Sequence, residues 1–406
     1  QCLSPCQKES DFYYDQEKVC HPKCEYPYTI QLADKIQICH SDVSVSEKQE
    51  LQKTSDAITE QGSYTSGGMK AASAMNSNSP SSALLVGLSS MMQSIRYMKV
   101  NYPPKVQTFF MLASDTPISL GFDFEIPSFI GNKLADSPLP DAFDRYDINS
   151  NFVYNLWDFL ATVLLVVVAI FLLSLIQNTL TKFPKVLLIF TKVLQTIKWN
   201  IPVMMICSSS GDIFFYATIH MRGSPLSSVS SVLCLLVAIF MIGVVIFILF
   251  SALNIVWTFR KNSRAVVPQN QTENDWKERF KGVEILYDEY EEKSIFSVAY
   301  MALFIIRGII FNLTLTILFE YPLAQCIIIN LTNFLMLGYL LYLRPLKNLL
   351  DIAQLFVNEG FMNVLMICVF ILAVLDKTGH YAKQTRVPIG SVILILIQAF
   401  SIFALI

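Results

Sequence analysis

The chain has 406 residues, of which 53% are hydrophobic and only 15% are charged. Its formal net charge of −2 excludes the strongly basic balance that is typical of nucleic-acid-binding proteins, so we expect no nucleic-acid partner. Apolar runs of about 20 residues recur through the second half, which predicts an all-α integral membrane protein with several transmembrane helices.

Five cysteines crowd the first 39 residues, with the spacing C-x3-C-x13-C-x3-C-x14-C. Such a pattern is typical of a small disulfide-rich module in an oxidising compartment, and residues 1–44 are expected to form an extracellular Cys-rich repeat. Because the number is odd, one cysteine is expected to pair upstream of Gln1, in a longer polypeptide. A zinc site that includes His21 and His40 is the alternative, although the spacing fits no standard ligand set. The predicted disulfide cysteines are Cys2, Cys6, Cys20, Cys24 and Cys39.

Residues 45–150 are expected to form an extracellular juxtamembrane domain. Its first part is rich in Ser, Gln, Ala and Gly, which is typical of a flexible linker. The stretch 82–100 is helical in character, but Gln93 and Arg96 interrupt an apolar run that is too short to cross a membrane. We therefore predict a surface helix that lies on or near the outer face of the membrane.

The region 151–406 is expected to form the transmembrane domain, with about seven helices. The second is the weakest, because three serines and Asp212 interrupt it. If the Cys-rich end is outside, the loops on the inner side carry most of the loop lysines and arginines, which agrees with the positive-inside rule. The predicted spans are 153–177, 201–221, 228–258, 295–319, 322–343, 354–375 and 388–406.

The segment 180–197 joins the first two predicted spans. On a helix, three of its lysines project from one side, opposite an apolar face. This pattern suits an interfacial helix held against anionic lipid of the inner leaflet, and a soluble loop is the alternative. The predicted lipid-facing lysines are Lys182, Lys185 and Lys192.

Two charged residues fall about half-way along predicted spans, namely Asp212 in the second and Arg307 in the fourth. A charge in the hydrocarbon region of a membrane destabilises the inserted helix by a few kcal/mol, so equal depth predicts an ion pair between them. The alternatives are a gating or permeation role and snorkelling without a partner. Glu359 falls near the inner start of the sixth predicted span and is expected to reach the interface.

The sequence contains no signature of an enzyme. HExxH, GxSxG and a phosphate-binding glycine loop are all missing from it. The four histidines are scattered along the chain, which gives hydrolytic or metal chemistry no obvious centre. We expect no enzymatic activity and no cofactor.

Four stretches, with the motifs Arg344–Pro345 and Asn358–Glu359 in the last, look like one known group of proteins. The chain is similar to the C-terminal multi-pass region of large ciliate surface proteins that carry Cys-rich growth-factor-receptor or EGF-like repeats. That region in turn resembles the TRP-like membrane domain of fungal flavin-carrier and polycystin-related proteins. The two motifs are expected to lie at the inner face. The resembling stretches are "MQSIRYMKVNYPPKVQTFF" (92–110), "LPDAFDRYDINSNFVYN" (139–155), "IIRGIIFNLTL" (305–315) and "YLLYLRPLKNLLDIAQLFVNEGF" (339–361).

The resemblance implies a TRP-like, channel-type transmembrane domain that is coupled to a Cys-rich ectodomain. Such a domain would conduct cations or act as a sensor. It also implies a plasma-membrane or ciliary location. The loops 320–322 and 376–387 are too short or too plain for a selectivity filter, which favours the alternative of a non-conducting surface anchor or adhesion protein. The expected partners are membrane lipids, other membrane or extracellular proteins, and further copies of the chain.

Overall fold

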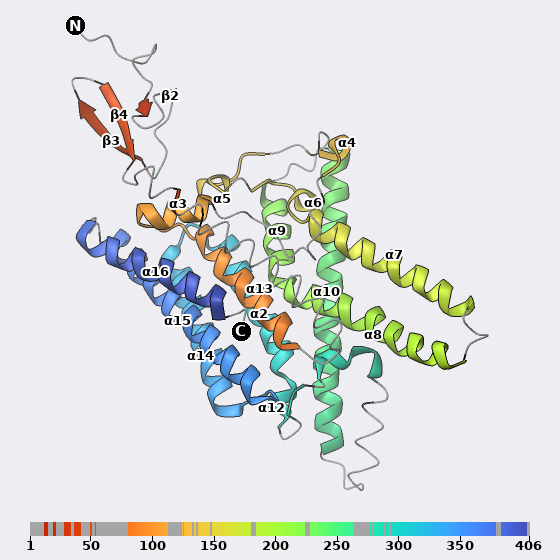
Figure 1. Ribbon diagram of the computed structural model, residues 1–406. Helices are drawn as coiled ribbons and strands as arrows, with labels where there is room; N and C mark the ends of the chain where they lie inside the picture. The colour runs from red at the N-terminus through yellow and green to blue at the C-terminus, as the bar shows by residue number, and fades with distance from the viewer. Residues whose placement is uncertain are drawn as a thin grey trace.

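The structure is a computed structural model, and it describes most of the chain from residue 80 onward together with short pieces before it (Figure 1). The described residues are 12–14, 19–21, 28–33, 36–41, 49–50, 53, 80–112, 124, 126–131, 134, 137–146, 148–179, 184–223, 228–263, 277, 280–287, 289–291, 294–378 and 383–403.

The N-terminal part contains a four-stranded sheet of order β2-β1-β4-β3. The strands β3 and β4 form an antiparallel hairpin, and β1 runs parallel to β4 and antiparallel to β2. The sheet lies apart from the helices, at the end of the molecule that carries α3 and α5 (Figure 1). The strands are β1 (Phe12–Tyr14), β2 (Val19–His21), β3 (Tyr28–Ala33) and β4 (Ile36–Ser41).

Two of the five predicted disulfide cysteines fall in this sheet. Cys20 lies opposite Tyr13, and Cys39 lies opposite Tyr14, so β1 separates the two strands that carry them. Their side chains lie outside the described residues. Cys2, Cys6 and Cys24 lie wholly outside the described residues, so the disulfides stay a prediction.

The other regular elements of the described chain are helices. Its helices are α2 (Pro80–Ser94), η1 (Ile95–Tyr97), α3 (Pro104–Leu112), α4 (Ser128–Gly131), α5 (Asp141–Asp144), α6 (Phe152–Asn155), α7 (Trp157–Thr179), α8 (Pro184–Ser208), α9 (Ser210–Gly223), α10 (Val229–Ser263), η3 (Lys281–Leu286), α12 (Ile295–Val298), α13 (Tyr300–Ile317), α14 (Pro322–Leu343), α15 (Leu349–Lys377) and α16 (Lys383–Phe403).

Among the described residues, five helices are long and apolar enough to cross a membrane, which confirms the prediction of a helical membrane protein. They are Trp157–Gln177, Val229–Asn262, Tyr300–Ile317, Pro322–Leu343 and Leu349–Lys377. The described residues therefore do not reach the predicted seven spans. In α16 the apolar part is shorter, Thr385–Phe400, because the helix begins with polar residues.

The predicted second span, 201–221, is divided between two helices. The first, α8, ends at Ser208, and α9 begins at Ser210. The hydroxyl groups of Ser208 and Ser210 donate to the carbonyl oxygens of Met205 and Cys207, at 2.9 and 2.8 Å. Serine hydroxyls that bond to the backbone in this way compete with regular helix geometry, which explains a break at the serine cluster.

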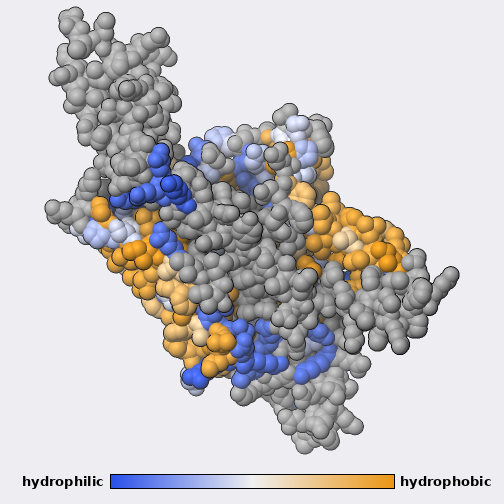
Figure 2. Space-filling view, viewed as in Figure 1, coloured by the Kyte–Doolittle hydropathy of each residue, from blue (hydrophilic) through white to orange (hydrophobic). Residues whose placement is uncertain are grey.

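The surface of the bundle carries a hydrophobic band. Figure 2 shows hydrophobic residues over α7 on one side and over α14 to α16 on the other, with hydrophilic residues above and below the second group. The most exposed apolar side chains of α10 and α14 include Phe240, Phe247, Phe250 and Leu335. Such faces are stable against lipid rather than water, which agrees with a membrane location.

Helix α2 lies inside the bundle. Leu84, Leu88 and Ile95 at its end are fully buried, and α2 packs against α8, α9, α13 and α15. Figure 1 shows α2 in the middle of these helices. The prediction that residues 82–100 lie on the membrane surface is therefore wrong, because the apolar side chains pack inside the bundle and the hydroxyl of Ser90 bonds to Asp212 on α9.

Two connections meet at one end of the bundle. The loop before α12 pairs with the link between α14 and α15 through the bridge Tyr290–Leu346. The N–H group of Glu291 donates to the carbonyl oxygen of Pro345 at 2.7 Å, and that of Lys347 donates to Glu289 at 2.9 Å. This agrees with the prediction that both connections lie on the same side of the membrane.

The predicted lipid-facing lysines are only partly described. Helix α8 covers Lys185 and Lys192, whose side chains lie outside the described residues, and Lys182 lies outside them altogether. Contact of these lysines with inner-leaflet lipid therefore stays a prediction.

Candidate functional site

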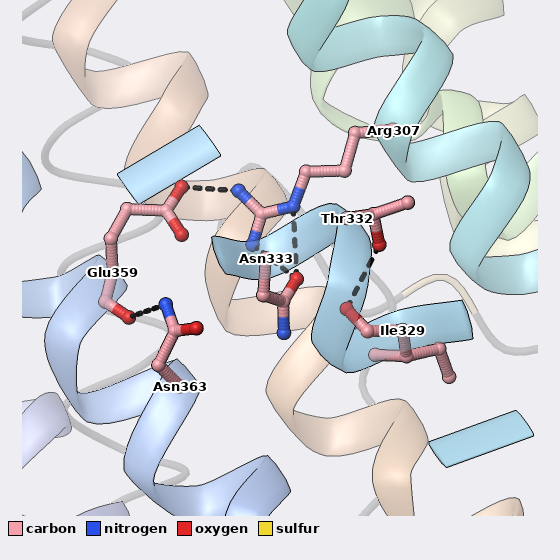
Figure 3. A network of polar contacts seen from close by, with 6 residues as sticks. All are labelled: Arg307, Ile329, Thr332, Asn333, Glu359 and Asn363. Carbon is pink, nitrogen blue, oxygen red and sulfur yellow. Dashed lines mark hydrogen bonds and ion pairs between the residues drawn. The ribbon is translucent and has the colours of Figure 1, made fainter. Parts of the chain in front are cut away.

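Arg307 ties three helices together in the middle of the bundle. Its side chain is buried on α13, and Nη1 forms an ion pair with Oε1 of Glu359 on α15. Nε and Nη2 donate to Oδ1 of Asn333 on α14, at 3.2 and 2.9 Å (Figure 3). A guanidinium group carries five N–H donors in a fixed plane, so one arginine can hold both partners at once.

The prediction that Arg307 pairs with Asp212 is wrong. Asp212 lies on α9 and accepts a hydrogen bond from the hydroxyl of Ser90 on α2, at 2.6 Å. Glu359 was not predicted as the partner of Arg307, because the helix was expected to begin at residue 354. In the structure α15 begins at Leu349 and is capped by the Asn348 side chain. The longer helix places Glu359 roughly 15 Å along its axis, which is a depth similar to that of Arg307.

The predicted inner-face motif is split between two environments. Asn358 and Glu359 are fully buried and lie more than two turns inside α15, where Glu359 meets Arg307, so their assignment to the inner face is wrong. Arg344 is exposed, and its backbone has a left-handed conformation with φ of 43°, which ends α14. A left-handed residue followed by proline is a common helix stop, which gives Arg344 and Pro345 a structural role in the turn to α15.

Several polar atoms beside Arg307 have no protein partner among the described residues. They include Oε2 of Glu359, Nδ2 of Asn333 and Oδ1 of Asn363. Both polar atoms of Asn358, which precedes Glu359 in α15, also have none. Asn363 donates through Nδ2 to the carbonyl oxygen of Glu359 at 2.8 Å. In Figure 3 the side chains of Asn333, Glu359 and Asn363 face one region between α14 and α15.

Burial of this polar cluster destabilises the folded protein. Each unsatisfied polar atom destabilises the fold by about 1–3 kcal/mol. Ionisable residues inside a membrane are rare and commonly belong to functional sites. One arginine and one glutamate leave the site formally neutral, so it favours neither a cation nor an anion. Within the described residues, no group of three or more His, Cys, Asp or Glu side chains could hold a metal ion.

An aromatic row links the site to the connection before α12. The rings of Tyr290 and Tyr300 lie 6.0 Å apart, and those of Tyr300 and Tyr339 lie 5.9 Å apart. Tyr300 precedes Arg307 by two helical turns on α13, and Tyr339 lies on α14. Burial raises the pKa of Tyr290 well above its ordinary value, so its hydroxyl stays protonated.

Helix α2 reaches the same part of α13 through a glycine contact. A Cβ atom on Gly87 would lie 2.9 Å from the ring of Phe304, and one on Gly308 would lie 3.3 Å from the methyl group of Met91 on α2. A small cavity beside them is lined by Ser90, Cys207 and other residues. The cavity has a volume of about 10 Å³, which is room for about one water molecule.

A second polar cluster ties the segment between η1 and α3 to the far end of the bundle. The N–H group of Asn101 donates to Oδ2 of Asp376 on α15 at 2.8 Å. Arg386 on α16 donates to the carbonyl oxygen of Asn101 at 3.0 Å and to Oδ1 of Asp376 at 2.5 Å. We call these three residues the Asn101 clamp.

Replacing Arg386 with glutamine is expected to destabilise the protein by about 1–3 kcal/mol, because two hydrogen bonds from a charged and largely buried group are lost. The midpoint of thermal unfolding in detergent measures this effect. Lys377→Gln removes the same charge from an exposed position at the end of α15 and should leave the midpoint nearly unchanged. Equal midpoints for both variants would show that the clamp contributes nothing.

Comparison of the chain with protein-family models, with curated proteins and with solved structures found no match to any of them. The likeness to ciliate surface proteins and to TRP-like membrane domains therefore stays an expectation from the resembling stretches.

Proposed function

We propose that the chain is a multi-pass cell-surface membrane protein whose channel-type, TRP-like transmembrane domain is coupled to a Cys-rich ectodomain and opens to cations in response to it. The observation that carries the proposal is the position of α2 inside the bundle. The segment that joins the N-terminal region to the transmembrane helices is part of their core, so a force on that region reaches the core directly.

The contacts of α2 indicate how such a force would travel. Ser90 bonds to Asp212 on α9, and Gly87 lies against Phe304, one turn before Arg307 on α13. Helix α2 also packs on α15, which carries Glu359. A displacement of α2 would therefore act on both helices that hold the Arg307–Glu359 ion pair, and the Asn101 clamp would act on the ends of α15 and α16.

The remaining features belong to the same proposal. The Cys-rich module is extracellular and disulfide-bonded, the protein lies in the plasma or ciliary membrane, and about seven helical segments form the transmembrane domain. The exposed apolar faces of α10 and α14 suit contact with lipid or with further copies of the chain. Several copies around one axis would supply a path for ions.

A non-conducting surface anchor or adhesion protein is the second candidate. The observation that favours it is the closed packing between α2, α9 and α13, where the cavity has room for about one water molecule. A hydrated ion does not fit there, so conduction requires either a movement of α2 or a path between copies.

Replacing Gly87 with leucine tests the proposal. The new side chain would collide with Phe304 and displace α2, so cation flux through proteoliposomes that contain the full chain is expected to rise by roughly tenfold. Gly360→Leu on α15 is the matched control, because no atom lies within 4 Å of a Cβ at that position. Flux at the level of protein-free vesicles in both the wild type and Gly87→Leu would reject conduction and favour the anchor.

A further inference from the structure

The small cavity between α2, α9 and α13 lies at the break between α8 and α9. Its lining includes Ser208, the last residue of α8, and Ser210, the first residue of α9. Ser90 of α2 and Asn312 of α13 also line it. Ser208, Ser210 and Asn312 are at most 5% exposed, so these polar groups are shielded from bulk solvent.

Each of the three serine hydroxyls donates its proton to a protein oxygen. Ser90 donates to Oδ1 of Asp212 at 2.6 Å, and Ser208 and Ser210 donate to backbone carbonyl oxygens of α8 at 2.9 and 2.8 Å. A hydroxyl group has one proton and two lone pairs. The serine oxygens therefore offer the cavity lone pairs, and their protons are already used.

Asn312 adds a fourth oxygen. Its Nδ2 donates to the carbonyl oxygen of Gly308 at 3.1 Å, which fixes the orientation of the amide, because a reversed amide would place one oxygen against another. Its Oδ1 is buried and has no protein partner within the described part of the chain. A buried amide oxygen of this kind destabilises the fold unless a ligand meets it.

Oxygen atoms are the ligands that hard cations prefer, and membrane proteins hold sodium where a transmembrane helix is interrupted. A water molecule in the cavity could donate two hydrogen bonds, but its own lone pairs would find no serine proton. A dehydrated sodium ion is smaller than a water molecule, so a cavity with room for one water also admits the ion. We propose that the cavity is a sodium-binding site, with oxygens of Ser90, Ser208, Ser210 and Asn312 as ligands.

Asp212 supplies the negative charge that a buried cation requires. Its carboxylate lies one hydrogen bond from the cavity, because it accepts the proton of Ser90. Two arginines lie on or next to the helices around the cavity, but neither lines it. Arg307 forms its ion pair with Glu359, and the guanidinium of Arg96 lies 5.0 Å from the ring centre of the next residue.

Binding of radioactive sodium to the purified full chain in detergent tests the proposal. We expect a single class of saturable sites that excess unlabelled sodium empties and that choline at equal ionic strength does not. Without saturable binding up to about 0.15 M sodium, the physiological ionic strength, the cavity would hold water alone and the proposal would be overturned. Binding in detergent involves no flux, so that result would leave cation conduction untouched.

The variant Asn312→Leu has a matched control in Asn330→Leu. Both asparagines donate Nδ2 to the carbonyl oxygen four residues earlier and have an Oδ1 without a partner among the described residues, but Asn330 does not line the cavity. Asn312→Leu is expected to weaken sodium binding by at least about tenfold, because a ligand of a charged group is lost. Asn330→Leu should bind sodium like the wild type. Equal sodium affinity in the two variants would contradict the assignment of Asn312 as a ligand.

The unfolding midpoint of the wild type provides a measurement that needs no variant at Asn312. A ion that binds only the folded chain raises the midpoint, so sodium chloride should raise it above its value in choline chloride at equal ionic strength. Ser90→Ala removes one ligand and the link to Asp212, and it should lose most of this difference. Identical midpoints of the wild type in the two salts would also overturn the proposal.

Discussion

Replacing Glu359 with leucine is expected to destabilise the bundle by about 3–5 kcal/mol, because the charge of Arg307 then lies buried without its partner. Arg307 is 3% exposed, and its other protein contacts are two bonds to one oxygen of Asn333, which cannot neutralise it. Reversible unfolding in mixed micelles measures the free energy. Glu320→Leu is the matched control at an exposed position and should change the free energy by less than about 0.5 kcal/mol.

The double variant Arg307→Met with Glu359→Leu separates the ion pair from simple packing. Removal of both charges leaves two apolar side chains in an apolar environment, so the double variant should be more stable than Glu359→Leu alone. The losses of unfolding free energy in the two single variants should therefore add up to more than the loss in the double variant. Simple additivity would show that the two residues do not interact.

Replacing Gly211 with alanine is expected to destabilise the protein by about 1–3 kcal/mol through overpacking, with about 1 kcal/mol more for a lost hydrogen bond. A Cβ atom at Gly211 would lie 2.2 Å from Nδ2 and 3.3 Å from Cγ of Asn312 on α13. The Asn312 side chain is buried and donates to the carbonyl oxygen of Gly308 at 3.1 Å, so its amide cannot move aside without losing that bond. Thermal unfolding of the purified protein measures the change.

Glycines elsewhere in the same bundle supply the controls. No atom lies within 4 Å of a Cβ built on Gly243 or Gly338. Alanine at either position should stabilise its helix by roughly 0.5–1 kcal/mol, because glycine loses more backbone entropy on folding. If Gly211→Ala changed the stability in the same direction and by the same amount as Gly338→Ala, α9 and α13 would not approach as closely as described.

The sequence alone was sufficient for the long apolar helices. The predicted spans 153–177, 228–258, 295–319 and 322–343 each coincide with one helix that can cross a membrane. An apolar run of this length predicts a helix without knowledge of its neighbours, because backbone groups within lipid must form their hydrogen bonds inside their own helix. The end of α14 at Arg344 was also readable, since proline follows it.

The start of α15 was open to sequence reasoning but was placed too late. Asn348 is followed by an apolar run with Asp351 in the first turn, which is a helix N-terminus signal. Recognition of this cap would have moved Glu359 into the membrane, to the depth of Arg307. The span predicted to begin at residue 354 placed that carboxylate at an interface instead.

What only the tertiary structure decided is which buried polar groups meet. Depth along a helix can be counted from a sequence, but several charges share a similar depth, and the choice between Asp212 and Glu359 depends on which helices are neighbours. Asn333 and Asn363 were not predicted for the same reason. The place of α2 was predicted wrongly, because a short apolar run with serines suits a membrane surface, and only the contacts of Ser90 with Asp212 and of Gly87 with Phe304 show it inside the bundle. Local patterns thus determined which segments are helices, whereas contacts between segments far apart in the chain determined the site.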